Sequence, residues 1–200
     1  NLDLGLFYNA PVSIRYANES ELMNTAGSLK RLQPLLTEDF VVAGGNVFLP
    51  DLDLSHVLAQ HRQWGSAGTI VLHPLLDQSR LRLFGQAKID HHSQITHFQE
   101  KPRQPISNLV HTTYQCYEPD VLSLVPSDSP CSIPELLIPR LLEANWPLYG
   151  YVTSSPLFSI STQEQYTETN AFFTNVDDGE GSSVCGGHTH ERRLVHHEHL

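Results

Sequence analysis

An acid, a cation and a proline stand together at Glu100, Lys101 and Pro102, directly after a segment that predicts a strand over residues 94–99. Proline has no backbone N–H to donate to a sheet ladder, so the strand is expected to end there. Glu100 and Lys101 are therefore expected at the C-terminal end of a strand, beside a rigid turn. A carboxylate accepts hydrogen bonds from hydroxyl groups, and an ammonium group is a compact positive charge for a phosphate. Taken alone, the three residues would equally suit a solvated turn.

The elements around this pair alternate between strands and helices. Strands are predicted over residues 12–16, 39–47, 68–75, 83–90, 94–99, 108–119 and 147–154, and helices over 53–65, 132–144 and 161–173. Asp53 or Ser55 can cap the first helix, Pro139 is expected to divide the second, and Thr162 can cap the third. The alternation predicts an α/β fold, a mostly parallel sheet with helices on both faces, Rossmann-like and incomplete at its N-terminus.

Ligands bind beyond the carboxyl ends of strands in open sheets of this kind. Glu100 and Lys101 are expected near such ends, together with Gly44, Gly45 and Asn46, which close the apolar run that begins at residue 39. The sequence therefore predicts one site at this edge of the sheet.

Composition excludes several classes of protein. The 200 residues include 40% hydrophobic and 17% charged residues, as in a soluble globular domain with a core. The formal net charge of -10 argues against a nucleic-acid partner. There is no apolar run of membrane-spanning length, so no membrane partner is expected. The 3 cysteines have no CxxC spacing, which favours a reducing, cytoplasmic location. Because the chain starts at Asn1, we expect an N-terminal truncation or a processed chain.

Several segments, collinear along the chain, resemble the sugar-nucleotide pyrophosphorylases, nucleotidyltransferases that join a sugar 1-phosphate to a nucleoside triphosphate and release pyrophosphate. The likeness is strongest to the mannose-1-phosphate guanylyltransferase branch. The segments are NTAGSLKRLQPLL (24–36), FVVAGGNVFLPDLDLSHVLAQHRQWG (40–65), FQEKP (98–102), SNLVHTTYQCYEPDVLSLVP (107–126), IPRLLEANWPLYGYV (138–152) and ISTQEQYTETN (160–170). Each segment is weak evidence alone, and their order makes the resemblance specific.

The resemblance implies a nucleotide sugar or a sugar 1-phosphate as the ligand. It implies that Glu100 binds sugar hydroxyls and that Lys101, the catalytic candidate, contacts the phosphate. The further substrate-binding candidates that it implies are Thr25, Ala26, Gly27, Gly45, Asn108 and His111. Mg²⁺ is the cofactor that the resemblance implies.

The chain departs from the family at several of these positions. The family's two metal-binding aspartates are matched by Asn46 and Ser159, so no metal ligand is assigned here. The family's N-A-G reads His111, Thr112 and Thr113, and its L-G reads Met23 and Asn24. Its N-terminal G-x-G-T-R loop has no match. We therefore expect a catalytically impaired domain, a pseudoenzyme that releases no pyrophosphate with Mg²⁺ and a nucleoside triphosphate.

Two alternatives stay open. One is a non-catalytic sugar-nucleotide-binding or regulatory homologue that pairs with an active enzyme, as a homo- or hetero-oligomer. The other is a structural remnant without affinity for a ligand. A hydrolase is not expected, because no G-x-S-x-G elbow occurs. His56 and His61 are expected to be surface or half-buried residues of their helix.

The predicted domain covers residues 1–173, and residues 174–200 are expected to form a polar tail rich in Gly, Ser and His. Metal binding by Cys185 and the histidines of this tail is expected to be adventitious.

Overall fold

The structure is a computed structural model that describes residues 14–177. The chain forms two compact units, residues 1–160 and residues 161–200. The predicted domain boundary after residue 173 stays a prediction. Residues 14–16 form no strand, so the strand predicted over residues 12–16 is wrong in its described part. Cys185 and the histidines of the predicted tail lie outside the described residues.

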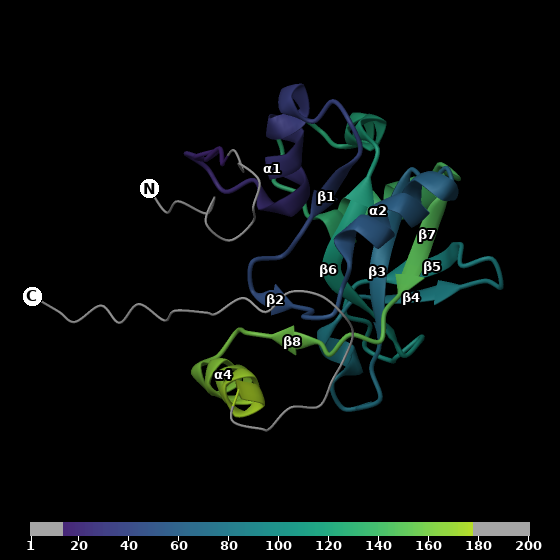
Figure 1. Cartoon of the computed structure of the whole chain (residues 1–200). Helices are drawn as coiled ribbons and strands as arrows, with labels where there is room; N and C mark the ends of the chain where they lie inside the picture. Colours follow the sequence, from purple (N-terminus) through teal and green to yellow (C-terminus); the bar gives the residue numbers. More distant parts are fainter. Residues whose placement is uncertain (1–13, 178–200) are drawn as a thin grey trace, which may run out of the picture. The chain divides into compact units, whose positions relative to one another are not determined.

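The first unit is built on a six-stranded sheet in the order β5-β4-β6-β3-β7, with β1 also beside β6 (Figure 1). Its strands are β1 (Phe40–Val42), β3 (Gly68–Pro74), β4 (Gln86–Ile89), β5 (Ile95–Gln99), β6 (Leu109–Tyr117) and β7 (Leu148–Val152). Two short strands, β2 (Val47–Phe48) and β8 (Phe158–Ser159), form a separate antiparallel pair.

The sheet is mixed, which corrects the prediction of a mostly parallel one. Strands β3 and β7 pair in parallel, whereas β6 runs antiparallel to β1, β3 and β4, and β4 runs antiparallel to β5. The α/β class is confirmed. Apolar patterns locate strands but do not set their direction, and β6 runs opposite to its three neighbours β1, β3 and β4.

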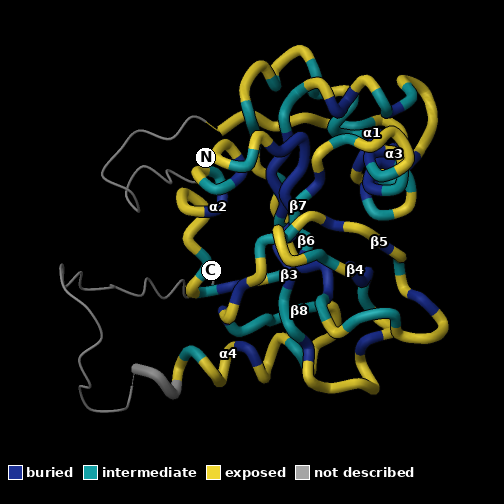
Figure 2. The backbone as a smooth tube through the Cα atoms, turned by 90° about the vertical axis from the view of Figure 1, so that its right-hand side faces the viewer, coloured by how far each residue is buried: buried dark blue, intermediate teal, exposed yellow. Residues whose placement is uncertain are grey.

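Helices cover both faces of the sheet, as predicted. They are α1 (Asn24–Leu32), α2 (Leu54–Gln63) and α3 (Ile138–Glu143), with the shorter turns η2 (Gln33–Leu35), η3 (Leu81–Leu83), η4 (Pro119–Leu124) and η5 (Ile133–Leu137). Ile70 of β3 belongs to the core with α1, η5 and α3, whereas its neighbour Val71 packs with Val57 of α2. Successive strand residues point to opposite faces, so β3 carries a core on each side. Figure 2 shows buried residues concentrated in the central strands β3 and β6.

The predicted helix starts are confirmed. The carboxylate of Asp53 accepts hydrogen bonds from the backbone N–H groups of Ser55, at 2.9 Å, and of His56, at 3.2 Å. Ser132 accepts from the N–H of Glu135 at 3.3 Å and donates to its carboxylate at 2.8 Å. The predicted helix over 132–144 is divided into η5 and α3, one residue before Pro139.

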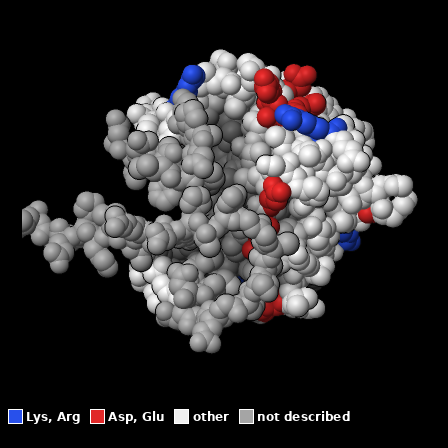
Figure 3. All heavy atoms as spheres, viewed as in Figure 1, with Lys and Arg blue, Asp and Glu red and all other residues white. Residues whose placement is uncertain are grey.

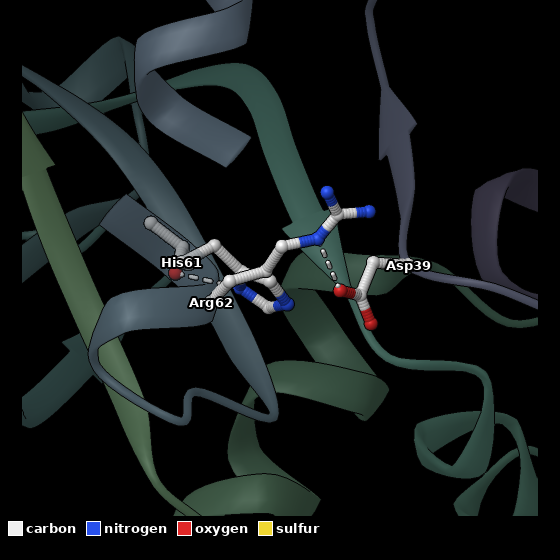
Figure 4. Close-up of polar contacts among 4 residues, drawn as sticks. Asp39, His61 and Arg62 are labelled. Atoms are coloured by element: carbon white, nitrogen blue, oxygen red, sulfur yellow. Dashed lines mark hydrogen bonds and ion pairs between the residues drawn. The ribbon is translucent and has the colours of Figure 1, made fainter. Parts of the chain in front are cut away.

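Two polar contacts join the end of α2 to β3 and to Asp39, the residue before β1 (Figure 4). His61 Nδ1 lies 2.9 Å from Thr69 Oγ1, and Arg62 Nε lies 3.0 Å from Asp39 Oδ2. His61 is only 1% exposed, and burial lowers its pKa. The prediction of a surface or half-buried His61 is therefore wrong, because the residue faces Thr69 beneath the helix. His56 is exposed, as predicted.

The second unit contains α4 (Gln163–Asp177), which confirms the helix predicted over 161–173. Thr162 Oγ1 accepts a hydrogen bond from the backbone N–H of Gln165 at 3.3 Å. Thr162 therefore caps α4, as predicted. Of the described helices, none has both the length and the apolar character needed to cross a membrane.

Charged side chains are unevenly spread over the face that Figure 3 shows. Figure 3 shows Asp and Glu side chains gathered along one part of it, with Lys and Arg side chains beside them. The expectation that nucleic acid is not a partner stays a prediction.

Candidate functional site

Glu100 and Lys101 directly follow β5, at its C-terminal end, as predicted. Lys101 has a φ of 42°, in the left-handed region, and its Nζ atom lies 3.7 Å from Glu100 Oε1. The two residues line a cavity of about 380 Å³ together with Phe98, Gln99, Pro134, Glu135 and Pro139. One wall is thus the end of β5, and the opposite wall is η5 and the start of α3.

The carboxylate of Glu100 is only partly satisfied. Its side chain is 20% exposed, and Oε2 is buried without a hydrogen-bond partner among the described residues. Burial raises the pKa of this carboxyl, the Lys101 ammonium opposes the rise, and the Glu135 carboxylate adds to it. Buried polar atoms are normally paired, so a ligand hydroxyl that donates to Oε2 would remove an energetic cost.

Gly85 brings Glu100 and His111 together. A Cβ atom at Gly85 would lie 2.5 Å from Glu100 Oε2 and 2.8 Å from Phe98 Cζ, so only glycine fits without displacing them. The carbonyl of Gly85 accepts from the N–H of His111 at 2.8 Å. Sequence reasoning missed Gly85, although a glycine inside a predicted strand, here the one over residues 83–90, is a signal of close approach.

His111 is buried behind the cavity-lining ring of Phe98. It is 6% exposed, and its ring meets that of Phe98 edge to face, with centroids 5.9 Å apart. Its Nε2 atom is buried and has no partner among the described residues. Burial lowers its pKa to about 4, and a hydrogen bond with the side chain of Gln115 opposes this. His111 is therefore neutral at physiological pH and can donate or accept a hydrogen bond.

Asn46 and Ser159, which match the family's metal-binding positions, lie on paired segments. Val47 pairs with Ser159, and the carbonyl of Asn46 accepts from the N–H of Ile160 at 2.8 Å. The two side chains provide no negative charge, and Asp53 is committed to capping α2. Within residues 14–177 no group of three His, Cys, Asp or Glu residues could hold a metal. Mg²⁺ prefers carboxylate and phosphate oxygens, so these residues do not fit it.

The segment from Thr25 to Gly27 is tied to the loop that leads into the cavity wall. Thr25 Oγ1 accepts from the N–H of Ile133 at 2.9 Å. The N–H groups of Ala26 and Gly27 donate to the carbonyl of Cys131, at 2.9 and 3.1 Å. These groups support the wall that continues to Pro134, and a direct contact with a ligand stays a prediction.

Gly45 and Asn108 lie outside the cavity. Gly45 is exposed beside Asn46, and a Cβ atom built on it meets nothing within 4 Å. Asn108 is exposed before β6, and its carbonyl accepts from the N–H of Leu75 at 2.9 Å. The structure therefore brings Glu100 and Lys101 together in the cavity, places His111 behind them, and leaves the other candidates around them.

The structure thus combines a carboxylate and a lysine in a cavity at the end of a strand of a mixed α/β sheet. Residues 3–154 match the nucleotidyl transferase family. The chain belongs to this family, and it is a sugar-phosphate nucleotidyltransferase-like domain.

Two of the relatives are named as a uridylyltransferase and a guanylyltransferase of sugar 1-phosphates. The chain is 30% identical over 133 residues to the UTP–glucose-1-phosphate uridylyltransferase of Synechocystis. The matched region covers 64% of this chain and 34% of the relative. It is 24% identical over 161 residues to the mannose-1-phosphate guanylyltransferase of Mycobacterium tuberculosis, covering 80% of this chain and 44% of the relative. The chain thus spans less than half the length of these curated relatives.

Solved structures show the same fold. A Bacillus anthracis protein assigned as a glucose-1-phosphate thymidylyltransferase matches with a TM-score of 0.71 at 21% identity, over 85% of this chain and 69% of that one. HddC from Yersinia pseudotuberculosis matches with a TM-score of 0.64 at 20% identity, over 78% and 64%. At such identities these structures support the fold alone.

Proposed function

We propose that this domain binds the sugar-phosphate moiety of a sugar 1-phosphate or a nucleotide sugar in the cavity beside β5. The observation that carries the proposal is the unpaired, buried Oε2 atom of Glu100 in the same cavity as the Lys101 ammonium. Glu100 accepts hydrogen bonds from sugar hydroxyls, and Lys101 pairs with the phosphate. Phe98, Pro134 and Pro139 offer apolar surface to the C–H face of the sugar.

We further propose that this chain by itself does not catalyse metal-dependent nucleotidyl transfer. Transfer of a phosphoryl or nucleotidyl group depends on charge neutralisation by a metal held in place. Asn46 and Ser159 supply no charge for such a metal. A purified chain that released pyrophosphate from a nucleoside triphosphate and a sugar 1-phosphate with Mg²⁺ would contradict this part of the proposal.

A regulatory role beside an active homologue is the second candidate. Among the relatives is a Drosophila protein named as the catalytic subunit beta of mannose-1-phosphate guanylyltransferase, 28% identical over 135 residues. A subunit named as catalytic implies other subunits in that protein's assembly, and we propose a comparable homo- or hetero-oligomer here.

The described cysteines, Cys116 and Cys131, are buried and free, which supports our proposal of a reducing, cytoplasmic location.

Calorimetric titration tests the binding proposal. Mannose 1-phosphate, glucose 1-phosphate, GDP-mannose and UDP-glucose are titrated into the chain, each with and without Mg²⁺. We expect Glu100→Gln and Lys101→Ala to weaken binding at least about tenfold, because each removes a charged hydrogen bond. Glu143→Gln and Lys88→Ala change the same residue types at exposed positions outside the cavity and serve as matched controls.

Each outcome separates the candidates. Binding that depends on Glu100 and is indifferent to Mg²⁺ supports a sugar-nucleotide-binding or regulatory domain. Binding that requires Mg²⁺ contradicts the proposed loss of the metal site. Failure to bind any of the four ligands rejects the proposed function and leaves a structural remnant.

A further inference from the structure

Strand β6 carries a bulge at residues 112–114. Ile70 of β3 pairs with Gln115, and Leu72 pairs with His111, so three residues of β6 stand opposite Val71 alone. Thr112 Oγ1 donates to the carbonyl of Val71 at 2.8 Å and so holds the bulge in place. Bulges of this kind re-aim side chains and are over-represented beside active sites.

The residue at the centre of the bulge, Thr113, is strained in two ways. Its φ is 70°, in the left-handed region, where a β-branched residue is a genuine outlier. Its hydroxyl is buried and has no hydrogen-bond partner among the described residues. Such strain persists only where the surroundings enforce it, and it concentrates at functional sites.

The Thr113 side chain packs on the backbone of Gly44. A Cβ atom built on Gly44 would lie 2.9 Å from Thr113 Cβ and would collide with Thr113 Oγ1. The next residue, Gly45, has nothing within 4 Å of its own Cβ position. Two adjacent glycines allow a ligand to approach the backbone closely. Here that approach is open at Gly45 and closed at Gly44 by Thr113.

Thr113 also links the surroundings of the Glu100 cavity to the segment that carries Asn46. Two residues before it, His111 contacts Gly85 and Phe98 at the Glu100 cavity. On its other side, Gly44 leads to Asn46, beside Ser159. A cavity of about 380 Å³ has room for a hexose phosphate, whereas a nucleotide sugar has to extend over neighbouring backbone.

We infer that Thr113 is a specificity-determining residue whose side chain covers the Gly44 backbone, so that the domain favours a sugar 1-phosphate over the larger nucleotide sugar. The inference rests on the proposed function and names the ligand class of the same site. The effect is steric: the strained side chain fills space that the nucleotide end of the larger ligand would need.

Substitution of Thr113 tests the inference in the full chain. Mannose 1-phosphate and GDP-mannose are titrated into the wild type and into Thr113→Gly, Thr113→Ala and Thr113→Ser. We expect Thr113→Gly to raise the affinity for GDP-mannose at least about tenfold and to change that for mannose 1-phosphate less than about twofold. Thr113→Ala should show a smaller gain, because it keeps a Cβ atom, and Thr113→Ser should show none, because it keeps the hydroxyl against Gly44.

Unfolding by urea, followed in parallel, separates ligand selection from structural strain. Glycine relieves the strained φ, so Thr113→Gly should become more stable whether or not the residue faces a ligand. A stabilised Thr113→Gly with an unchanged ratio of the two affinities overturns the inference. If that variant does not fold, the affinity ratio of Thr113→Ala decides in the same way.

The outcome for the proposed function is read separately. If the wild type binds mannose 1-phosphate through Glu100 but the Thr113 variants keep the wild-type ratio, the proposed function stands and this inference fails. If neither ligand binds the wild type or Thr113→Gly, both fail.

Discussion

Two residues with positive φ lie at positions where the sugar-nucleotide pyrophosphorylases, which the sequence resembles, have glycine. Asn24 has a φ of 56° and Thr113 a φ of 70°. Both positions therefore have a backbone conformation that glycine adopts readily, although neither residue is glycine. Asparagine tolerates this conformation, whereas threonine is strained in it. The sequence showed both departures, but it could not show that they differ in cost.

Substitution of Gly85 tests how tightly the cavity acid is held. Gly85→Ala places a methyl group against Glu100 Oε2 and Phe98 Cζ. We expect a loss of about 1–3 kcal/mol in the free energy of unfolding, as for other overpacked sites. Gly45→Ala, whose methyl group meets no neighbour, is the control for stability and should stay within about 0.5 kcal/mol.

The same variant should weaken binding of mannose 1-phosphate through Glu100. A double-mutant cycle of Gly85→Ala and Glu100→Gln isolates this coupling. We expect the double variant to bind no worse than Glu100→Gln alone. Fully additive losses would show that Gly85 does not act through Glu100.

His111 gives the fold a sensitivity to acid. Burial lowers its pKa to about 4, below the ordinary value of 6.5, so the unfolded chain binds more protons than the folded one between these values. Its contribution to stability is complete above the ordinary value and is lost as the pH falls through this window. Between about pH 7 and about pH 5, we expect the free energy of unfolding to fall by about 2 kcal/mol less in His111→Asn than in the wild type.

Urea unfolding at a series of pH values measures this difference. The comparison with His111→Asn is needed because burial also lowers the pKa of His61 and His73, and raises those of Glu100 and Glu118, which act in the opposite direction. Parallel pH profiles of the variant and the wild type would contradict the assignment to His111.

At the scale of elements, the ends of helices were predicted well from the sequence, whereas the pairing of strands was not. The cap at Asp53 and the division before Pro139 depend on neighbouring residues, so the sequence was enough to predict them. The direction of β6 and its bulge depend on β3, which lies about 40 residues earlier in the chain. The cavity followed the same rule: its β5 wall was predicted, whereas Pro134 and Glu135 of the opposite wall were not.

The Asp53 cap can be measured directly. Asp53→Ala removes the acceptor of two backbone N–H groups at the start of α2, and we expect it to cost about 1 kcal/mol of unfolding free energy. Asp51→Ala removes an exposed carboxylate from the same loop and should cost less than about 0.5 kcal/mol. Equal losses in urea unfolding would show that general charge effects, and not the cap, stabilise this helix.

At the scale of the whole molecule, the question is what the uncharged residues Asn46 and Ser159 mean for the binding of a metal ion by this domain. The chain carries a formal net charge of -10, yet neither Asn46 nor Ser159 contributes to it. The fold still places these two positions side by side, through the pairing of β2 with β8. Whether side chains at these two positions could share one metal ion is a prediction that can be tested.

Restoring the charge tests this view. Asn46→Asp combined with Ser159→Asp places two carboxylates on paired segments, where both can reach one cation. We expect the double variant to bind Mg²⁺ at least about tenfold more tightly than the wild type, and each single variant to gain less, because attraction for a divalent ion grows with each added charge. Titration with MgCl₂ alone measures the affinity without relying on catalysis. The double variant Asn145→Asp with Ser154→Asp adds the same charge at exposed positions and should show no gain. Equal Mg²⁺ affinity in the two double variants would mean that the paired positions have lost the geometry of a metal site as well as its charge.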